Sequence, residues 1–233
     1  MAATCDALFA LIPLIIVGSK AEVAEVKAIL HAVAEYKTAC RTIMAARAAD
    51  AADGVRQIEL AAYTTHCALE PPHLMLALNM AMAMAFKHKN FIHAAGFAKR
   101  LLEMPDINSA KNAQLLQRVR GGAWRSRARV AHTPSPLPSQ LAPSLFVLQA
   151  KAVLQKSEAE ARNALKVDYD ERTPFALCAG SLTPIYRGAE LVRSPYSGAA
   201  YLPSFKGAIC VIDGMAAIGL ETLGLVSLNS AKK

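Results

Sequence analysis

Short apolar pieces separated by proline and glycine fill the stretch from Asp168 to Cys210. Aromatic and β-branched residues form runs of only a few positions before each Pro or Gly, which leaves no room for a long helix. The pattern predicts a small, turn-rich antiparallel β unit. Its last two strands are expected at Gly207–Ile212 and Glu221–Leu228, joined by a turn over Gly214–Gly219.

The region before this stretch has helical periodicity. Ser19-Lys-Ala-Glu22 is a capping-box pattern, which opens a helix because side chain and backbone satisfy each other's hydrogen bonds. Apolar residues then recur at spacings of three and four, which predicts one buried stripe on an amphipathic helix. The stripe comprises Val26, Ile29, Val33, Tyr36, Cys40 and Ile43.

Three more helices are expected before residue 104. Asp53 is placed to cap the first of these helices, and Pro71 and Pro72 end that helix. Pro72 also suits the first turn of the second helix. That next helix, about His73–Phe86, is apolar nearly all round, as a central helix of a bundle would be. A helix from Phe91 to about Glu103 follows a short turn, so we expect antiparallel helical hairpins.

Proline and arginine dominate the segment after Gly121, and proline at this density does not continue a helix or a central strand. The sequence therefore predicts an α+β fold in which amino-terminal antiparallel helical hairpins are followed by a small turn-rich antiparallel β unit. The expected parts are a helical domain at residues 1–120, a disordered Pro/Arg-rich insert at 121–149, a helix at 150–166 and a small β-rich domain at 167–233.

The net charge of +8 comes from one window. Lys87 to Arg129 holds ten Lys or Arg residues and two acids, and the rest of the chain is balanced. The alternative function that this window suggests is a small basic RNA-binding protein, although specific nucleic-acid binding is not expected. The apolar run Ala7–Gly18 leaves open a secreted protein with a cleaved amino terminus, but it lacks preceding Lys or Arg and is too short to span a bilayer.

No catalytic or metal-binding signature is evident. Five widely spaced cysteines favour reduced thiols, and Cys178 and Cys210 lack the two further ligands of a structural zinc site. His66 and His73 are separated by two prolines, so one helical face cannot present both. The sequence contains no phosphate-binding glycine loop and no nucleophile elbow. We therefore expect a protein that is not an enzyme and uses no cofactor or metal.

Two blocks of the sequence resemble the carboxyl-terminal region of coatomer alpha subunits. The first runs over Glu59–Leu74 and Phe86–Glu103, and the second over Tyr169–Cys210, especially Pro184-Ile-Tyr-Arg-Gly188 and Phe205-Lys-Gly207. Residues 7–48 are similar more weakly. Many members of that family carry a Cys-Pro-x-x-Gly-x-Cys pattern.

This chain departs from the family pattern in three ways. Ser194 and Ala200 stand where those two cysteines would be. Residues 121–149 have no counterpart in the family. The amino-terminal β-propellers of the family have no counterpart in this sequence. The chain therefore looks like a carboxyl-terminal fragment, and the family's role in reading cargo does not carry over to it.

The resemblance implies a coat-scaffold protein that binds the coatomer epsilon subunit, together with other coatomer subunits, in vesicle coat assembly for retrograde Golgi-to-ER transport. The chain would then be cytoplasmic, lie peripherally on Golgi membranes and coated vesicles through the coat, and contain no transmembrane segment. The expected partner-binding residues are Pro184, Ile185, Tyr186, Arg187, Gly188, Tyr201, Phe205 and Gly207.

Overall fold

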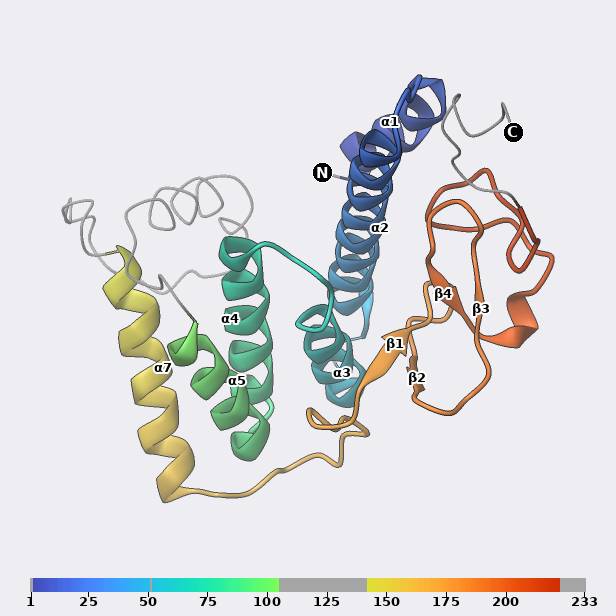
Figure 1. The fold of residues 1–233 in the computed structure, drawn as a ribbon. Helices are drawn as coiled ribbons and strands as arrows, with labels where there is room; N and C mark the ends of the chain where they lie inside the picture. Colours follow the sequence, from blue (N-terminus) through green and yellow to red (C-terminus); the bar gives the residue numbers. More distant parts are fainter. Residues whose placement is uncertain (1, 51, 105–141, 223–233) are drawn as a thin grey trace. The chain divides into compact units, whose positions relative to one another are not determined.

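A computed structural model describes residues 2–50, 52–104 and 142–222 (Figure 1). Residues 121–141 of the expected insert over 121–149, and residues 223–228 of the expected strand Glu221–Leu228, lie outside these ranges. The chain divides into two compact units. We call residues 50–65 and 70–167 the helical unit, and residues 1–49, 66–69 and 168–233 the mixed unit.

The helical unit is built from antiparallel helices. Within it α4 packs against both α3 and α5, and α5 packs against α7. The helices described in this unit are α3 (Gly54–Thr64), α4 (Pro71–Lys87), α5 (Phe91–Glu103) and α7 (Ala142–Ala159).

The starts of these helices follow the local sequence, as predicted. The Asp53 carboxylate accepts a hydrogen bond from the backbone N–H of Arg56 at 3.0 Å and so caps α3. Pro71 and Pro72 occupy the first turn of α4, where a missing N–H costs nothing. Between α4 and α5 the chain reverses at Lys89, whose φ is 57°.

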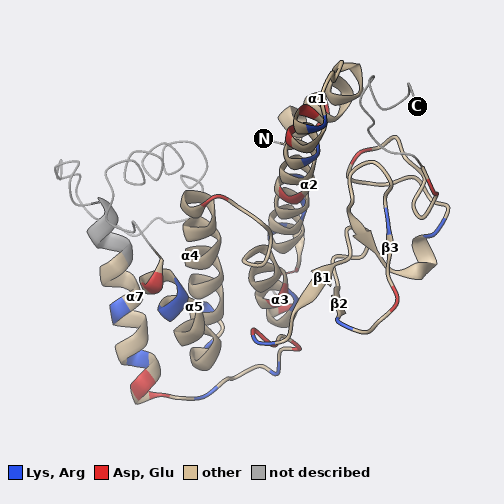
Figure 2. Cartoon of the chain, in the orientation of Figure 1, with Lys and Arg blue, Asp and Glu red and all other residues tan. Residues whose placement is uncertain are grey.

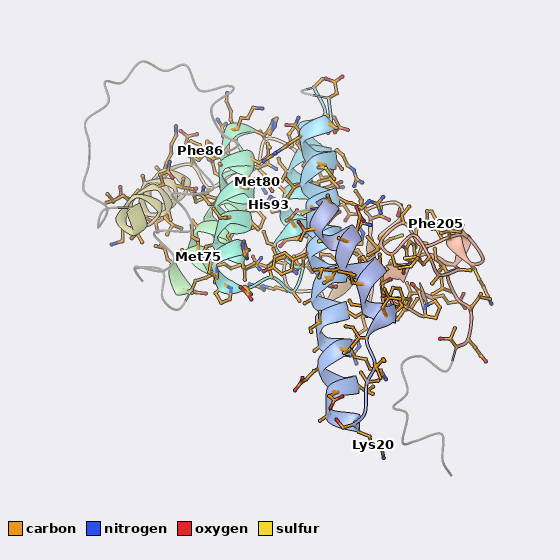
Figure 3. The ribbon with its side chains drawn as sticks, turned by 90° about the horizontal axis from the view of Figure 1, so that it is seen from above. Lys20, Met75, Met80, Phe86, His93 and Phe205 are labelled. Carbon is orange, nitrogen blue, oxygen red and sulfur yellow. The ribbon has the colours of Figure 1, made fainter. Side chains whose placement is uncertain are left out.

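The apolar helix α4 is central, as its composition indicates. Met75, Leu78 and Met82 are buried, while Met80 is only half-buried. Figure 3 shows the side chains of Met75 and Met80 along this helix. Because α3 and α5 flank α4, residues on several sides of the helix find apolar neighbours.

Helix α7 differs from its expected bounds. It begins at Ala142, inside the segment 121–149 that the sequence predicts to be disordered, and ends at Ala159 rather than at residue 166. Proline is compatible with a first helical turn, so Pro143 does not prevent this start. The chain after Ala159 returns to the α4–α5 turn, where the Phe91 N–H donates to the Arg162 carbonyl at 3.0 Å.

The mixed unit joins the first helices to the β region. It comprises α1 (Ala2–Leu11), η1 (Ile12–Leu14), α2 (Lys20–Ala48), β1 (Phe175–Leu177), β2 (Pro184–Tyr186), β3 (Val192–Arg193), β4 (Ala200–Tyr201) and η2 (Pro203–Phe205). Small antiparallel strands beside a larger helical content confirm the α+β class.

The capping box at the start of α2 is confirmed. The Glu22 N–H donates to Ser19 Oγ at 3.2 Å, and the Glu22 carboxylate accepts from the Gly18 N–H at 2.8 Å, one residue before the usual partner. The predicted stripe is only partly correct, because Ile29 is 49% exposed and Leu30 is buried in its place.

The β region contains two two-stranded antiparallel sheets. β1 pairs with β2, with Ala176 opposite Ile185, and β3 pairs with β4, with Val192 opposite Tyr201. The strand expected at Gly207–Ile212 is wrong. Only an isolated bridge joins Ile209 to Ala217, within the segment expected to be the turn. A tight turn at Gly214, with φ of 72°, brings the chain back too early for a longer ladder.

One core holds the mixed unit together. Phe9 of α1 and the α2 residues Val26, Leu30 and Val33 belong to the same buried cluster as Tyr201. Residues 1–49 therefore group with the carboxyl-terminal region rather than with the other helices, which differs from the expected helical domain over 1–120. Periodicity shows that a helix has an apolar face but does not show what covers it.

Among the described residues, no helix combines the length and the apolar content needed to cross a bilayer.

Candidate partner-binding surface

The eight expected partner-binding residues lie at two neighbouring places in the mixed unit. Pro184–Gly188 form β2 and the turn after it, while Tyr201, Phe205 and Gly207 lie in β4 and around η2. The Ala179 N–H donates to the Ala200 carbonyl at 2.8 Å, which holds the end of β1 against β4.

Two of these residues are interior and cannot be presented to a partner. Ile185 is 3% exposed and Tyr201 is 0% exposed, and both belong to the buried cluster of the mixed unit. The Tyr201 hydroxyl lies 3.0 Å from Cys210 Sγ. Burial raises the pKa of Tyr201, so the phenol stays neutral at physiological pH. Their burial argues against direct contact with a partner, and alternation along strands of only two or three residues does not show which face is inward.

The turn after β2 is exposed to solvent. Arg187 and Gly188 are exposed, and the half-buried Tyr186 ring packs edge-to-face on Phe175, with centroids 5.8 Å apart. Gly188 has φ of 100°, a conformation that favours glycine. The turn therefore shows a cation beside an anchored aromatic ring.

Phe205 forms the second part of the surface. Its half-buried ring lies 5.9 Å from that of Tyr201 and directly over Gly180, where a β-carbon would approach the ring to 2.7 Å. Figure 3 shows this side chain at the β region of the mixed unit. Lys206 and Gly207 beside it are exposed.

Sequence reasoning missed a buried carboxylate that fixes the loops of this unit. Asp213 is 6% exposed. Its Oδ1 accepts from the N–H groups of Met215 and Ala216 at 2.9 Å each, and its Oδ2 accepts from Ser194 Oγ at 2.8 Å. The signal in the sequence was Asp213-Gly214, a turn pair whose carboxylate bonds to the backbone that follows.

This carboxylate predicts acid sensitivity. Burial by itself raises the pKa of Asp213, but the hydrogen bonds from Ala216, Met215 and neighbouring groups outweigh burial, so the folded pKa lies below the ordinary value of an aspartate. A depressed pKa contributes stability that is complete above the unfolded pKa of about 3.9 and is lost as pH falls through the folded pKa.

Replacing Asp213 by asparagine should therefore destabilise the mixed unit by about 1–2 kcal/mol at neutral pH, since charge-assisted hydrogen bonds are lost. The variant should also lose less stability than the wild type when pH falls from neutral to below 4. Urea denaturation across this range measures both effects. An equal acid dependence in the two proteins would contradict the role of Asp213.

No described group of side chains is arranged as a metal centre. Cys210 Sγ is shared between Tyr201 Oη at 3.0 Å and Ser197 Oγ at 3.4 Å, and Ser194 Oγ is bonded to Asp213. Across residues 2–50, 52–104 and 142–222, no three His, Cys, Asp or Glu side chains converge as ligands would. The expectation of no metal and no cofactor stays a prediction.

One histidine in each unit forms a hydrogen bond within that unit. His66 Nε2 lies 2.7 Å from the Tyr169 hydroxyl in the mixed unit, while His88 Nε2 lies 3.1 Å from Gln57 Oε1 in the helical unit. Both rings serve as hydrogen-bonded packing groups.

The basic window does not form a continuous surface over its described part. Arg100 donates to Thr65 Oγ1 at 3.1 Å and to the Thr65 carbonyl at 3.2 Å, which ties its guanidinium into the helical unit. Figure 2 colours basic and acidic positions along the same helices. By sequence, α5 carries both Lys99 and Glu103. The window's residues beyond Met104 lie outside the described ranges, and nothing in the described part favours RNA binding.

Comparison with known proteins gives one consistent family. A family model for the C-terminus of the coatomer (COPI) alpha subunit matches residues 2–121 and 140–232. Its match skips 122–139, so the expectation that residues 121–149 lack a counterpart in the family is correct for these residues and wrong for residues 121 and 140–149, which the model matches.

Curated relatives agree with that model. The chain is 36% identical to coatomer subunit alpha-1 of Arabidopsis thaliana over 215 residues, covering 92% of this chain and 15% of the relative. It is 35% identical over 178 residues to coatomer subunit alpha of Dictyostelium discoideum, covering 76% of this chain and 12% of the relative. Coatomer subunit alpha of Saccharomyces cerevisiae is 29% identical over 84% of this chain and 13% of its own length.

Proposed function

The chain belongs to the coatomer (COPI) alpha family, in the region that forms the C-terminus of the alpha subunit, and on this basis we propose that it is a coat-scaffold module that binds the coatomer epsilon subunit. The observation that carries the proposal is the family match over nearly the whole described chain. The chain spans about 15% of the length of the plant relatives that it matches. Any activity of a whole alpha subunit therefore applies to this chain only as a proposal.

The proposed biological role is coat assembly for retrograde Golgi-to-ER transport. The module would be cytoplasmic and would reach Golgi membranes and coated vesicles peripherally, through its contacts with the other coatomer subunits. It would act by binding and not by catalysis. An interlocked hydrogen-bond network around Asp213 and a shared apolar core support a rigid scaffold role.

Within this role, the surface proposed for the epsilon subunit is narrower than the sequence predicts. It keeps the β2 turn with Tyr186 and Arg187, and the exposed region around Phe205 and Gly207. Aromatic and arginine side chains at the centre of an interface commonly carry much of its energy. Ile185 and Tyr201 support this surface from inside.

Reversing the charge of Arg187 should weaken the complex with the epsilon subunit. Arg187 is exposed and forms no ion pair among the described residues, so Arg187→Glu removes a cation of the proposed surface without disturbing the core. We expect the dissociation constant to rise about tenfold, which corresponds to ~1.4 kcal/mol. The measurement is titration of purified chain with purified epsilon subunit, with the product sized to confirm a one-to-one complex.

Lys151→Glu is the matched control, because Lys151 is an exposed cation on α7 in the other unit. This variant should bind normally. No complex at tens of micromolar with a demonstrably folded chain would remove the epsilon assignment. Equal weakening by both substitutions would instead show a nonspecific charge effect and remove this surface from the proposal.

A further inference from the structure

A groove within the mixed unit is not explained by the proposed epsilon surface. It has a volume of about 1160 Å³ and opens between α2, the β3–β4 loop and the chain after Asp213. Pro13 also lines it, and Lys27, Leu30 and His31 line it from one face of α2, as their spacing of three and four requires. None of the residues kept in the epsilon surface lines it.

The groove exposes apolar surface that a folded protein normally covers. Met215 is 51% exposed and Leu220 is 58% exposed, and both lie on its wall. Leu30, Pro195 and Tyr196 supply further apolar lining. Exposed apolar side chains gathered in a concave site, rather than scattered singly, are typical of a binding surface.

The groove walls are held in place before any ligand arrives. The Tyr196 hydroxyl donates to the Phe9 carbonyl at 2.8 Å, and its ring packs edge-to-face on the Phe9 ring. Asp213 accepts from the Met215 N–H and from Ser194 Oγ, so one buried carboxylate connects two segments of the wall. A preformed site loses less conformational freedom when it binds, and affinity rises accordingly.

The groove carries two formal positive charges and one negative charge. Lys27 and Arg193 line it together with the imidazole of His31, against a single exposed acid, Glu221. None of these three basic side chains has an ion-pair partner within the described residues. Arg193 donates one hydrogen bond, to the Gly198 carbonyl at 2.9 Å, which leaves its other N–H groups available.

We propose that this groove is a docking site for an acidic peptide segment that carries an apolar anchor. The anchor would sit against Leu30, Met215 and Leu220, and its flanking carboxylates would meet Lys27, His31 and Arg193. Charge complementarity selects this occupant, because a basic or purely apolar segment would leave the cations of the rim desolvated and unpaired. The inference goes beyond the proposed function, since it requires no epsilon subunit.

The test uses the whole chain and a fluorescently labelled short peptide in which two leucines three positions apart are flanked on both sides by Asp and Glu. Anisotropy should report binding that weakens as salt increases, because carboxylate contacts are screened. The double variant Met215→Asp with Leu220→Asp, and the double variant Lys27→Glu with Arg193→Glu, should each raise the dissociation constant at least about tenfold.

Matched controls separate the groove from the general surface. Ile209→Asp with Val211→Asp changes two apolar residues of the same unit that are 68% and 48% exposed but lie outside the groove. Lys20→Glu changes an exposed cation on α2, the helix that carries Lys27, and an acid is favourable at a helix start. Both controls should bind the peptide as the wild type does, and a peptide with serine in place of leucine should bind poorly.

Several outcomes would overturn the proposal. The first is absence of peptide binding at tens of micromolar, and the second is an equal loss of peptide affinity in the groove variants and the control variants. The third is peptide binding that appears only after residues 223–233 are deleted, which would mean that a segment of this same chain occupies the groove. Complex formation with the epsilon subunit is measured on the same variants. If the unmodified chain binds the peptide but forms no complex with the epsilon subunit, the proposed function fails and the peptide site stands.

Discussion

Replacing Tyr201 by alanine should lower the free energy of unfolding of the mixed unit by about 4 kcal/mol, in the range measured for removing a buried aromatic ring. Tyr201 is 0% exposed and its ring packs against Phe205. Its removal would leave a cavity between β4 and the α1–α2 core and would take away the hydroxyl beside Cys210 Sγ. Hydrogen exchange followed by mass spectrometry measures the effect separately in each unit.

The conservative variant Tyr201→Phe tests the cause. It keeps the ring and removes only the hydroxyl, so we expect a loss of about 1 kcal/mol. The helical unit should keep its exchange protection in both variants. If Tyr201→Ala left the mixed unit fully protected while abolishing epsilon binding, Tyr201 would be an interface residue and the interior position described here would be contradicted.

Replacing Asn90 by alanine should destabilise the helical unit by about 2–3 kcal/mol, because it breaks two hydrogen bonds made by a fully buried amide. Asn90 is 0% exposed. Its Nδ2 donates to the Leu165 carbonyl at 3.0 Å, and its Oδ1 accepts from the Leu165 N–H at 2.8 Å. One side chain thereby attaches the segment after α7 to the α4–α5 turn, and exchange protection around residues 160–167 reports its loss.

Two variants separate the hydrogen bonds from the shape of the side chain. Asn90→Asp keeps the size but places an acceptor against the Leu165 carbonyl, so it should destabilise the unit at least as much as alanine at neutral pH. Asn163→Ala alters a half-buried residue of the same junction and should cost about 1 kcal/mol or less. A stable Asn90→Asp protein would show that the paired bonds contribute little.

Local chemistry made the starts of α2, α3 and α4 predictable. Ser19 and Glu22 form a capping box, and Asp53 caps α3, through contacts that span only three residues. Pro71 and Pro72 act through their own fixed backbone angle and missing N–H. Such features are decided within one turn of chain, so the sequence alone contains the information.

The exposure of the residues in the proposed partner surface was predictable only in part. The Pro and Gly stops around β2 correctly indicated a turn, and Arg187 and Gly188 are exposed there. The same pattern could not place Tyr201 inside, because an aromatic residue in a two-residue strand is equally compatible with either face. Asp213 was missed because its importance depends on Ser194, which lies nineteen residues away.

By itself the sequence determined the starts of α2, α3 and α4, the α+β class, the turn-rich character of the carboxyl-terminal region and the family resemblance. Only the tertiary structure decided that residues of α2 share a buried cluster with Tyr201 of β4, that Leu30 replaces Ile29 in the core, and that Lys27, Met215 and Leu220 share one groove. The physical reason is that caps and turns satisfy nearby backbone groups, whereas apolar burial has no direction and takes whichever distant surfaces fit together.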